Sequence, residues 1–557
     1  MLSALKWNLF GNYSQYIRRP ELENWLGSWE VRFLILAFLL LMLSLPGLLK
    51  ILRFEWGKLS RSTKNSLWLL LLLALALRLF LPPAGHRLFY DEDLYLNMGQ
   101  NIAELGRTQN TLWGETFYGI YKNYSSYLNK EPSGFPFVLS LVFTLFGVGE
   151  AQAFLFMKIL GGLAVLPVFG IGLLMFGESV GVFAALLFAL LPVHIIWSAS
   201  ASSEPTYAFF SALAVFLLLL FSRHRETSVK IALVSTLALA VQCRIEGMLL
   251  LIPALAVLIF NRGKLKFSQF LWMGGLLLFL IFPYLLHFNY VKQMDWESET
   301  GVKFALRYFA LNLPPNLQFF TANRQFPLLY SFLILLGLIY GLKRERLRNT
   351  FCLALWSLIF YLPYLFYYAG SYAWGVNVRY AIFITVPLCI LAASGLDWLL
   401  GRLELIFPTS REEVAQGAPS RATVLILMLI FLQFLPFLNI IRTPYEECWD
   451  GRAEHKFLTD FCRTLPENCF IITGTPALVL LTGKGAIETR NFNDETLKWM
   501  RNRKAEIYLF EDYWNSYRTN LNRFQRLLSR YDFTLVESQN LNDRTVRIFR
   551  LNYPARP

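Results

Sequence analysis

The chain has 557 residues and a net charge of +14 at pH 7, and its composition excludes most soluble classes of protein. Only 16% of the residues are charged and 55% are hydrophobic, whereas an ordinary soluble protein has about 25% charged residues. The mean hydropathy is +0.43. Disordered, collagen-like and coiled-coil classes are excluded by the same numbers. The composition predicts a polytopic α-helical membrane protein. Nucleic-acid binding is not indicated, because the basic residues gather in short segments between apolar runs.

About twelve membrane-spanning helices are predicted, after an N-terminal segment (1–30) that lacks the order of a cleavable signal peptide. In chain order the apolar runs cover 31–52, 66–83, 152–175, 180–198, 205–222, 231–243, 247–261, 267–288, 326–342, 350–369, 381–400 and 422–441.

The segments between these runs alternate between two kinds. Short basic segments are expected in the cytoplasm, and longer aromatic, acid-bearing segments outside it. The basic set is 53–64, 223–230, 262–266 and 343–348. The other set is 84–151, 199–204, 244–246, 289–325 and 370–380. The alternation has no conflict and predicts a multi-pass membrane protein. We expect it in the plasma membrane, the inner membrane of a bacterium.

Two regions are predicted to lie outside the bilayer. The first outer loop, 84–151, contains an apolar stretch (135–148) that is too short to span and is expected to lie flat as an interfacial helix. The transmembrane domain covers 31–441, and 442–557 is predicted to be an extracytoplasmic α/β domain. In that domain we expect helices at 455–465 and 517–531 and strands at 469–473, 506–510, 533–537 and 545–551. One disulfide is allowed among Cys448, Cys462 and Cys469.

Three consecutive acids, Asp91, Glu92 and Asp93, follow the second apolar run and begin an amphipathic helix. Acids near a membrane surface are costly unless they are solvated or used. They either cap the helix on the favourable end of its dipole, or they supply a general base or a metal ligand in an outward cavity.

Further ionisable residues lie at the outer ends of other apolar runs. Each one alone is explained by a snorkelling side chain or an interfacial ion pair. Together they could form a cavity in which cations bind an anionic headgroup and acids activate a hydroxyl. Soluble-enzyme motifs such as a P-loop are absent, and His86, His194 and His287 are interpreted as structural. The outer-end residues are Lys130, Glu131, Glu204, Arg244, Glu246 and Arg379.

The motif Asp91-Glu92-x-x-Tyr95, followed by Lys130-x-Pro132, resembles the GT-C glycosyltransferases of the family 39 and aminoarabinose-transferase type. Protein O-mannosyltransferases belong to the same broad group. The resemblance runs from about residue 66 over most of the chain. It includes Phe146-Gly147-x-Gly149-Glu150, Glu204 with Phe209-Phe210, Arg379-Tyr380 and, near the C-terminus, Leu480-Leu481-Thr482-Gly483-Lys484.

The resemblance implies inverting transfer of a sugar from a polyprenyl-phosphate donor, in the membrane lipid, to a glycan, lipid or protein acceptor on the outer face. Asp91 is implied as catalytic base, and Glu92 is expected as a second catalytic residue. Two departures are a glutamate at Glu204, where aspartate is usual, and Lys-Glu-Pro in place of Lys-Pro-Pro. Four residues are expected to bind the donor phosphate: Lys130, Arg379, Tyr380 and Arg244. Glu204 and Asp93 are expected to contact the acceptor or to hold a divalent cation, Mg²⁺ or Mn²⁺; no other cofactor is required.

Two other functions fit the same residues. One is another ligase or polymerase of lipid-linked glycans, and the other is a transporter. A transporter would carry its ionisable residues in the middle of the runs. Here the middles are almost free of charge, with Lys158 the nearest exception, which favours the enzyme.

Overall fold

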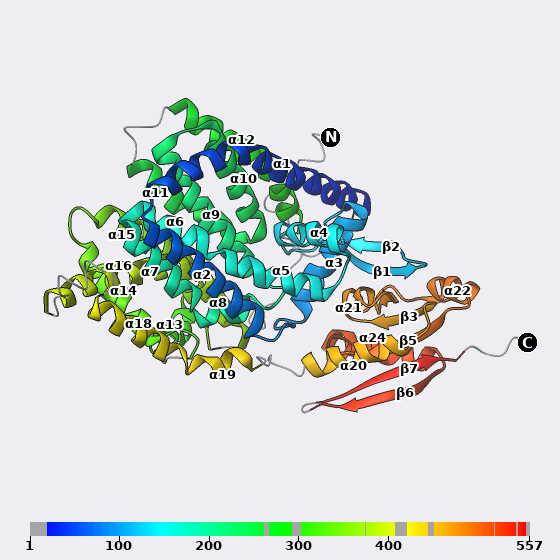
Figure 1. Ribbon diagram of the computed structural model, residues 1–557. Coiled ribbons are helices and arrows are strands. Elements are labelled where there is room, and N and C mark those ends of the chain that lie inside the picture. The colour runs from blue at the N-terminus through cyan, green and yellow to red at the C-terminus, as the bar shows by residue number, and fades with distance from the viewer. Residues whose placement is uncertain are drawn as a thin grey trace, which may run out of the picture.

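The computed structural model in Figure 1 describes residues 19–260, 267–291, 302–322, 324–373, 375–406, 420–443, 451–516, 518–541 and 544–552. A bundle of helices forms most of the molecule, and a sheet lies against one end of the bundle. The predicted basic segment 262–266 and Cys448 lie outside the described residues.

The bundle contains every one of the twelve predicted apolar runs. Seven helices or helix pairs in the described residues are long and apolar enough to cross a membrane, and shorter apolar helices complete the set. The polytopic helical fold is therefore confirmed. The helices of the bundle are α1 (Pro20–Lys58), α2 (Arg61–Phe80), α5 (Glu150–Leu163), α6 (Val165–Phe176), α7 (Glu178–Ala189), α8 (Pro192–Trp197), α9 (Ser203–His224), α10 (Thr227–Cys243), η2 (Ile245–Leu250), α11 (Leu251–Phe260), α12 (Phe267–Val291), α14 (Leu328–Gly341), α15 (Leu347–Phe366), η4 (Gly375–Ala381), α16 (Ile382–Ile406), α18 (Arg421–Phe434) and α19 (Phe437–Arg442).

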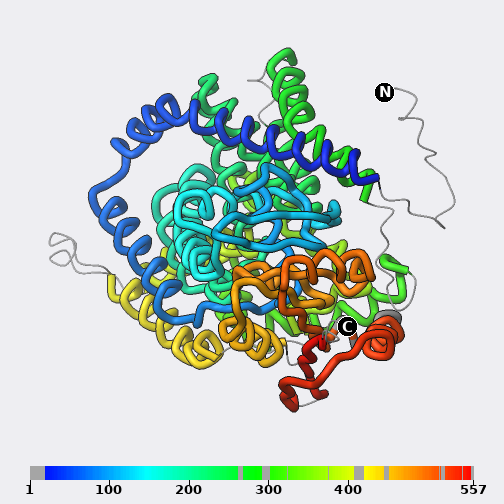
Figure 2. The backbone as a smooth tube through the Cα atoms, turned by 90° about the vertical axis from the view of Figure 1, so that its right-hand side faces the viewer, coloured from blue at the N-terminus to red at the C-terminus, as the bar shows by residue number. Residues whose placement is uncertain are grey.

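Helix α1 begins eleven residues before the predicted run at 31, because its polar first turns are buried rather than solvated. Pro20 stands at its start, where a missing N–H costs nothing. Glu30 accepts a hydrogen bond from Thr108 Oγ1 at 3.1 Å and lies 2.7 Å from His287 Nδ1. The other ring nitrogen of His287 contacts the carbonyl of Asn129 at 2.7 Å. Helix α1 is thereby fixed to the chain just before Lys130, and Figure 2 shows it crossing the upper edge of the bundle.

Three of the basic segments gather at one end of the bundle, as their common predicted side requires. His224 Nε2 lies 2.7 Å from Glu55 Oε1, which joins the α9–α10 turn to the α1–α2 turn. The Ser60 hydroxyl donates to Glu178 at 2.8 Å, and Asn349 donates to the carbonyl of Met175 at 2.6 Å. These bonds join the α6–α7 and α14–α15 turns to the same end.

The first outer loop and the C-terminal region form one continuous sheet. Its order is β2-β1-β4-β3-β5-β7-β6. Strand β1 pairs with β4 antiparallel, with Trp113 opposite Ile487 and Gly114 opposite Ala486. The loop strands were not anticipated from the sequence, and they extend the sheet beyond the predicted 442–557 boundary. The strands are β1 (Asn110–Phe117), β2 (Ile120–Tyr127), β3 (Cys469–Thr473), β4 (Gly485–Glu488), β5 (Glu506–Glu511), β6 (Phe533–Asn540) and β7 (Thr545–Leu551).

Helices cover this sheet and connect it to the bundle (Figures 1 and 2). Leu481 packs against an apolar cluster that contains Tyr95, Phe135 and Phe154, so the segment 480–484 is a second place, besides the β1–β4 pair, where the C-terminal region contacts the outer loop. Cys462 and Cys469 are both free thiols, so the two do not form a disulfide. Helices in this half are α3 (Tyr90–Leu105), α4 (Gly134–Phe146), α20 (Gly451–Thr464), α21 (Pro476–Leu481), α22 (Asp494–Asn502), α23 (Tyr513–Ser516) and α24 (Arg518–Arg530), and α13 (Arg307–Thr321) lies in the predicted loop 289–325.

Candidate active site

Glu92 holds the first turn of α3 in place. Its Oε2 accepts hydrogen bonds from the backbone N–H groups of Arg87, Leu88 and Phe89 at 2.7, 2.9 and 3.0 Å. Phe89 has a φ of +48°, a left-handed conformation that is strained for a residue with a side chain. Burial raises the pKa of Glu92, but the hydrogen bonds from His86 and from the backbone N–H groups of Leu88 and Arg87 help to hold the pKa below its usual value. The capping interpretation of the acidic motif therefore applies to Glu92.

Asp91 points away from this cap, toward η4. Its side chain is 30% exposed, and Oδ2 lies 3.6 Å from Nη2 of Arg379. Burial, together with the charge of Glu131, raises the pKa of Asp91 to about 6 against the attraction of Arg379. A general base works best when its pKa lies near the working pH. Asp91 thus combines access, a cationic neighbour and a suitable basicity.

A row of alternating charges continues from Asp91 into the bundle. Glu204, buried in the first turn of α9, receives Nε of Arg379 at 2.8 Å and Nη1 of Arg244 at 3.2 Å on the same oxygen, Oε1. Glu246 then holds Arg244 with two parallel bonds of 2.8 and 3.2 Å. Paired bonds of this kind fix a guanidinium in one plane. Four elements, α3, η4, α9 and η2, therefore meet through one charged row.

Aromatic rings support this row from one side. The guanidinium of Arg379 lies 4.7 Å from the ring centroid of Tyr380, and its Nη2 donates to the Tyr380 hydroxyl at 3.3 Å. Tyr380 stacks on Tyr364 with a centroid distance of 4.4 Å. The Tyr364 hydroxyl in turn donates to Glu246 at 2.5 Å. Tyr380 therefore orients Arg379, in addition to lying where a donor-phosphate contact is predicted.

Lys130 lies at the more exposed side of the site. Its side chain is 36% exposed, and Nζ lies 3.6 Å from Oε1 of Glu131. The other oxygen of Glu131 accepts a hydrogen bond from the Tyr95 hydroxyl at 2.9 Å. Ser203 Oγ lies 3.5 Å from the same hydroxyl, next to Glu204 in the chain. Glu131 thus joins Tyr95 of the DExxY motif to Lys130. The sequence did not indicate this contact.

Glu204 and Asp93, predicted to share a role, belong to separate clusters. Two guanidinium groups contact the same oxygen of Glu204, so its surroundings do not fit Mg²⁺ or Mn²⁺. Asp93 instead faces His455 of α20, with 3.4 Å between Oδ1 and Nε2, and His86, with 3.9 Å. His86, which was interpreted as structural, is one member of a group of four ionisable side chains.

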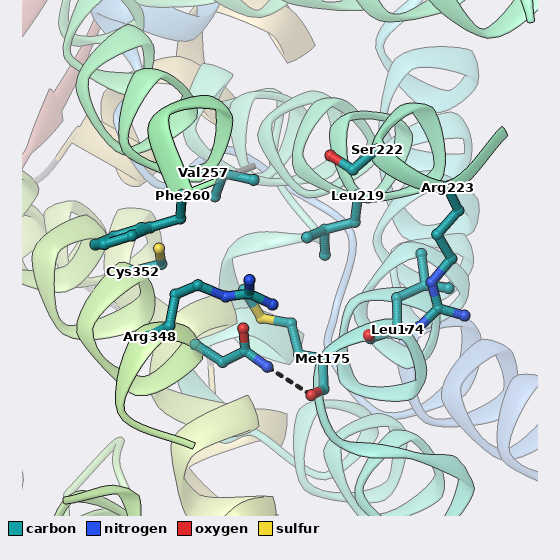
Figure 3. A pocket seen from close by; sticks show the side chains of 10 residues that line it. Leu174, Met175, Leu219, Ser222, Arg223, Val257, Phe260, Arg348 and Cys352 are labelled. Carbon is teal, nitrogen blue, oxygen red and sulfur yellow. Dashed lines mark hydrogen bonds between the residues drawn. The ribbon is translucent and has the colours of Figure 1, made fainter. Parts of the chain in front are cut away.

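The charged row lies at the end of the bundle opposite to the basic turns. Glu204 is the second residue of α9 and Arg223 lies near its end, 19 residues later; at 1.5 Å per residue they are roughly 28 Å apart along the helix. A separate cavity of about 250 Å³ lies beside Arg223 (Figure 3). It is lined by Arg348, Cys352 and Phe260 among others. Cationic groups therefore lie at both ends of the bundle. Asp91 and Glu204, the acids of the candidate site, lie at the end opposite to this cavity.

Comparisons with known proteins confirm the predicted resemblance. Residues 130–287 match the family model described as dolichyl-phosphate-mannose-protein mannosyltransferase. No curated protein matches this chain in sequence at a significant level.

Solved structures with the same fold are GT-C glycosyltransferases, the class that the DExxY motif predicted. One is ArnT from Cupriavidus metallidurans bound to undecaprenyl phosphate, which is 13% identical with a TM-score of 0.56 over 88% of this chain and 98% of that one. Another is the oligosaccharyltransferase AglB from Archaeoglobus fulgidus, in complex with an inhibitory peptide and a dolichol-phosphate. It is 14% identical with a TM-score of 0.53 over 87% of this chain and 74% of that one. The multi-pass GT-C fold is thereby established.

Proposed function

We propose that this protein is a glycosyltransferase that moves a sugar from a polyprenyl-phosphate donor to a hydroxyl of an acceptor, with inversion at the anomeric carbon. The proposal is supported by the family match, by the fold shared with polyprenyl-phosphate-binding proteins, and by the charged row. The observation that carries it is the contact between the accessible carboxylate of Asp91 and Arg379, whose position is fixed by the buried Glu204.

Asp91 takes the part of general base. It removes the proton of the acceptor hydroxyl while the hydroxyl oxygen attacks the anomeric carbon of the donor. The bond between that carbon and the phosphate oxygen breaks, and polyprenyl phosphate leaves with the bonding electrons. One proton goes to Asp91, so the step is balanced without a further reactant.

Arg379, Arg244 and Lys130 take the part of phosphate ligands. The leaving phosphate gains charge as the bond breaks, and fixed cations stabilise that charge in the transition state. Arg244 and Arg379 are already oriented by Glu204, Glu246 and Tyr380, so little side-chain order has to be gained when the donor binds.

A transfer assay tests this function. Purified protein in proteoliposomes is given undecaprenyl-phosphate sugars one at a time, with pools of lipid, peptide and glycan acceptors, and free undecaprenyl phosphate is measured. We expect release that depends on one donor, on one acceptor pool and on Asp91. Absence of release from every donor, by protein that remains folded, would remove the proposal.

We further propose that the protein lies in the plasma membrane of a bacterium with the charged row on the extracytoplasmic side. The gathering of basic turns at the opposite end of the bundle supports this orientation. A single cysteine at Glu345 should resist an impermeant thiol reagent in intact cells, whereas one at Glu104 should react. Labelling at 345 without permeabilisation would reverse the assignment.

A further inference from the structure

Four side chains from separate segments meet beside α3 without taking part in the charged row. They are His86 before α3, Asp93 in its first turn, Glu150 at the start of α5 and His455 in α20 of the C-terminal region. Each offers one ligand atom, and these four atoms all lie within 4.8 Å of one another. Two neutral imidazoles and two carboxylates form a set of donors that transition metals accept readily.

Three of the distances between these atoms are close to those in a tetrahedral metal site. Bonds of about 2.0–2.1 Å to zinc place two tetrahedral ligands about 3.3 Å apart. Nε2 of His86 lies 3.2 Å from Oε1 of Glu150, and Nε2 of His455 lies 3.4 Å from Oδ1 of Asp93 and 3.5 Å from Glu150. The contact from His86 to Asp93 is 3.9 Å, and the two remaining pairs lie within 4.8 Å. Tetrahedral binding therefore requires the four side chains to close on the ion.

These contacts are close, yet they are not hydrogen bonds. Nε2 of His86, Oδ1 of Asp93 and Nε2 of His455 are buried and have no hydrogen-bond partner. The side chains of His86 and Asp93 are each only 4% exposed. Buried polar atoms without partners are rare because each one loses its hydrogen bonds to water and gains none in the protein. A cation at the centre of the four would satisfy all of them.

The outer contacts of both histidines leave Nε2 free to bind a cation. Nδ1 of His86 lies 3.2 Å from Oε2 of Glu92, the acid that caps α3. Nδ1 of His455 lies 3.4 Å from the hydroxyl of Thr459, which itself donates to the carbonyl of His455 at 2.6 Å. In each ring the Nδ1–H group donates a hydrogen bond away from the cluster, to a carboxylate for His86 and to a hydroxyl for His455. Metal-binding histidines usually donate their other N–H group in this way.

We propose that His86, Asp93, Glu150 and His455 bind one divalent transition-metal ion, of which Zn²⁺ is the best match. All four coordination positions come from the protein, which is the pattern of a structural rather than a catalytic zinc site. The ion joins α20 to α3 and α5, so it holds the C-terminal region on the bundle. It also fixes the turn that carries Asp91, two residues before Asp93. It takes no part in the transfer step and is independent of the proposed donor.

Metal content of the full-length protein tests this directly. Protein purified without chelator or added metal is analysed by mass spectrometry of its elements, then stripped and titrated with Zn²⁺ and with Co²⁺. We expect one equivalent of zinc per chain and, with Co²⁺, the visible absorption of a tetrahedral ion. Hydrogen exchange of the α20 amides should rise when the metal is removed. Wild-type protein that binds no Zn²⁺ and no Co²⁺ would overturn the proposal.

Variants locate the site within the chain. His455→Gln should abolish the Co²⁺ absorption, and Thr459→Val, which alters only the outer layer, should weaken zinc binding about 10-fold. The matched control is His224→Gln, which removes a histidine bound to Glu55 at the far end of the bundle and should keep one equivalent. If His455→Gln retains full binding while His224→Gln loses it, the assignment is wrong. Because Thr459→Val keeps every ligand, it remains informative even if His455→Gln fails to fold.

Discussion

Asp91 and Asp93 stand two residues apart on α3, yet they enter clusters of opposite chemistry. Asp91 faces the guanidinium of Arg379 and is partly exposed, whereas Asp93 faces two imidazoles and is buried. A guanidinium keeps its charge at any working pH and repels metal ions, while a neutral imidazole is itself a ligand. The partner, not the acid, therefore decides whether a carboxylate is suited to transfer or to binding a metal.

The largest effect in this comparison is expected from Asp91→Asn. The amide keeps the shape and the helix start but cannot accept a proton, so the transfer rate should fall by at least about 10²-fold. Donor binding should be retained, because the arginine row is unchanged. Initial rates and donor binding in proteoliposomes measure both.

Glu104→Gln is the matched control, since Glu104 is an exposed acid at the other end of the same helix. It should leave the rate unchanged. Near-normal turnover of Asp91→Asn would assign the base to another residue. Asp91 would then no longer differ from Asp93 by a role in transfer.

A second substitution, Arg379→Lys, tests the other side of the charged row. Lysine keeps the charge but loses the planar fork that bonds Glu204 and reaches Asp91. Lost hydrogen bonds to charged groups cost about 1.5–3 kcal/mol, so we expect weaker donor binding and transfer that is slower by about 10-fold or more. The matched control is Arg346→Lys, because Arg346 pairs with Asp397 at the opposite end of the bundle. Equal losses in both variants would show a general effect on stability.

Glu204→Gln separates the two clusters by their response to metal. The glutamine leaves two guanidinium groups facing one neutral oxygen, so both charge-assisted bonds to that oxygen, worth about 1.5–3 kcal/mol each, are weakened. We therefore expect a lower melting temperature and transfer reduced by about 10-fold or more. The zinc content of Glu204→Gln should stay at the wild-type value, and wild-type protein treated with a chelator and then reloaded with zinc alone should keep its transfer rate. A chelated wild type that only Mg²⁺ or Mn²⁺ reactivates, while Glu204→Gln stays impaired with either ion, would instead place a cation at Glu204.

The smallest effect is expected from Lys130→Met. Its ammonium is 36% exposed and lies 3.6 Å from Glu131, and exposed ion pairs contribute about 0–1 kcal/mol. The donor KM should therefore rise by no more than about 5-fold. A titration of the donor at fixed acceptor measures this. A loss as large as that of Arg379→Lys would mean that Lys130 is desolvated when the donor binds.

Much of the helical fold was predictable, because a span needs a long apolar run and such runs are visible in any single sequence. The meeting of Asp91, Glu204 and Arg379 was also predictable in outline. Alternating loops put these residues at one end of the bundle, although nothing in the sequence indicated that both arginines bond the same oxygen of Glu204.

The metal cluster could not be predicted in the same way. His86 and His455 are separated by more than three hundred residues and have no spacing motif; only the docking of α20 on α3 brings them together. The same applies to β1, whose partner β4 comes from the C-terminal region. Long-range pairing of this kind depends on tertiary contacts, which local patterns do not encode. Glu92 was assigned to catalysis for a related reason, since a capping acid and a reactive acid look alike in sequence.

The position of the donor phosphate tests the central claim most directly. The full-length protein would be solved in lipid nanodiscs with undecaprenyl phosphate. We predict phosphate density within hydrogen-bonding distance of the Arg379 guanidinium, with Asp91 facing the space that the sugar would occupy. Phosphate density in the cavity beside Arg223 and Arg348, at the opposite end of the bundle, with none at Arg379, would contradict the account.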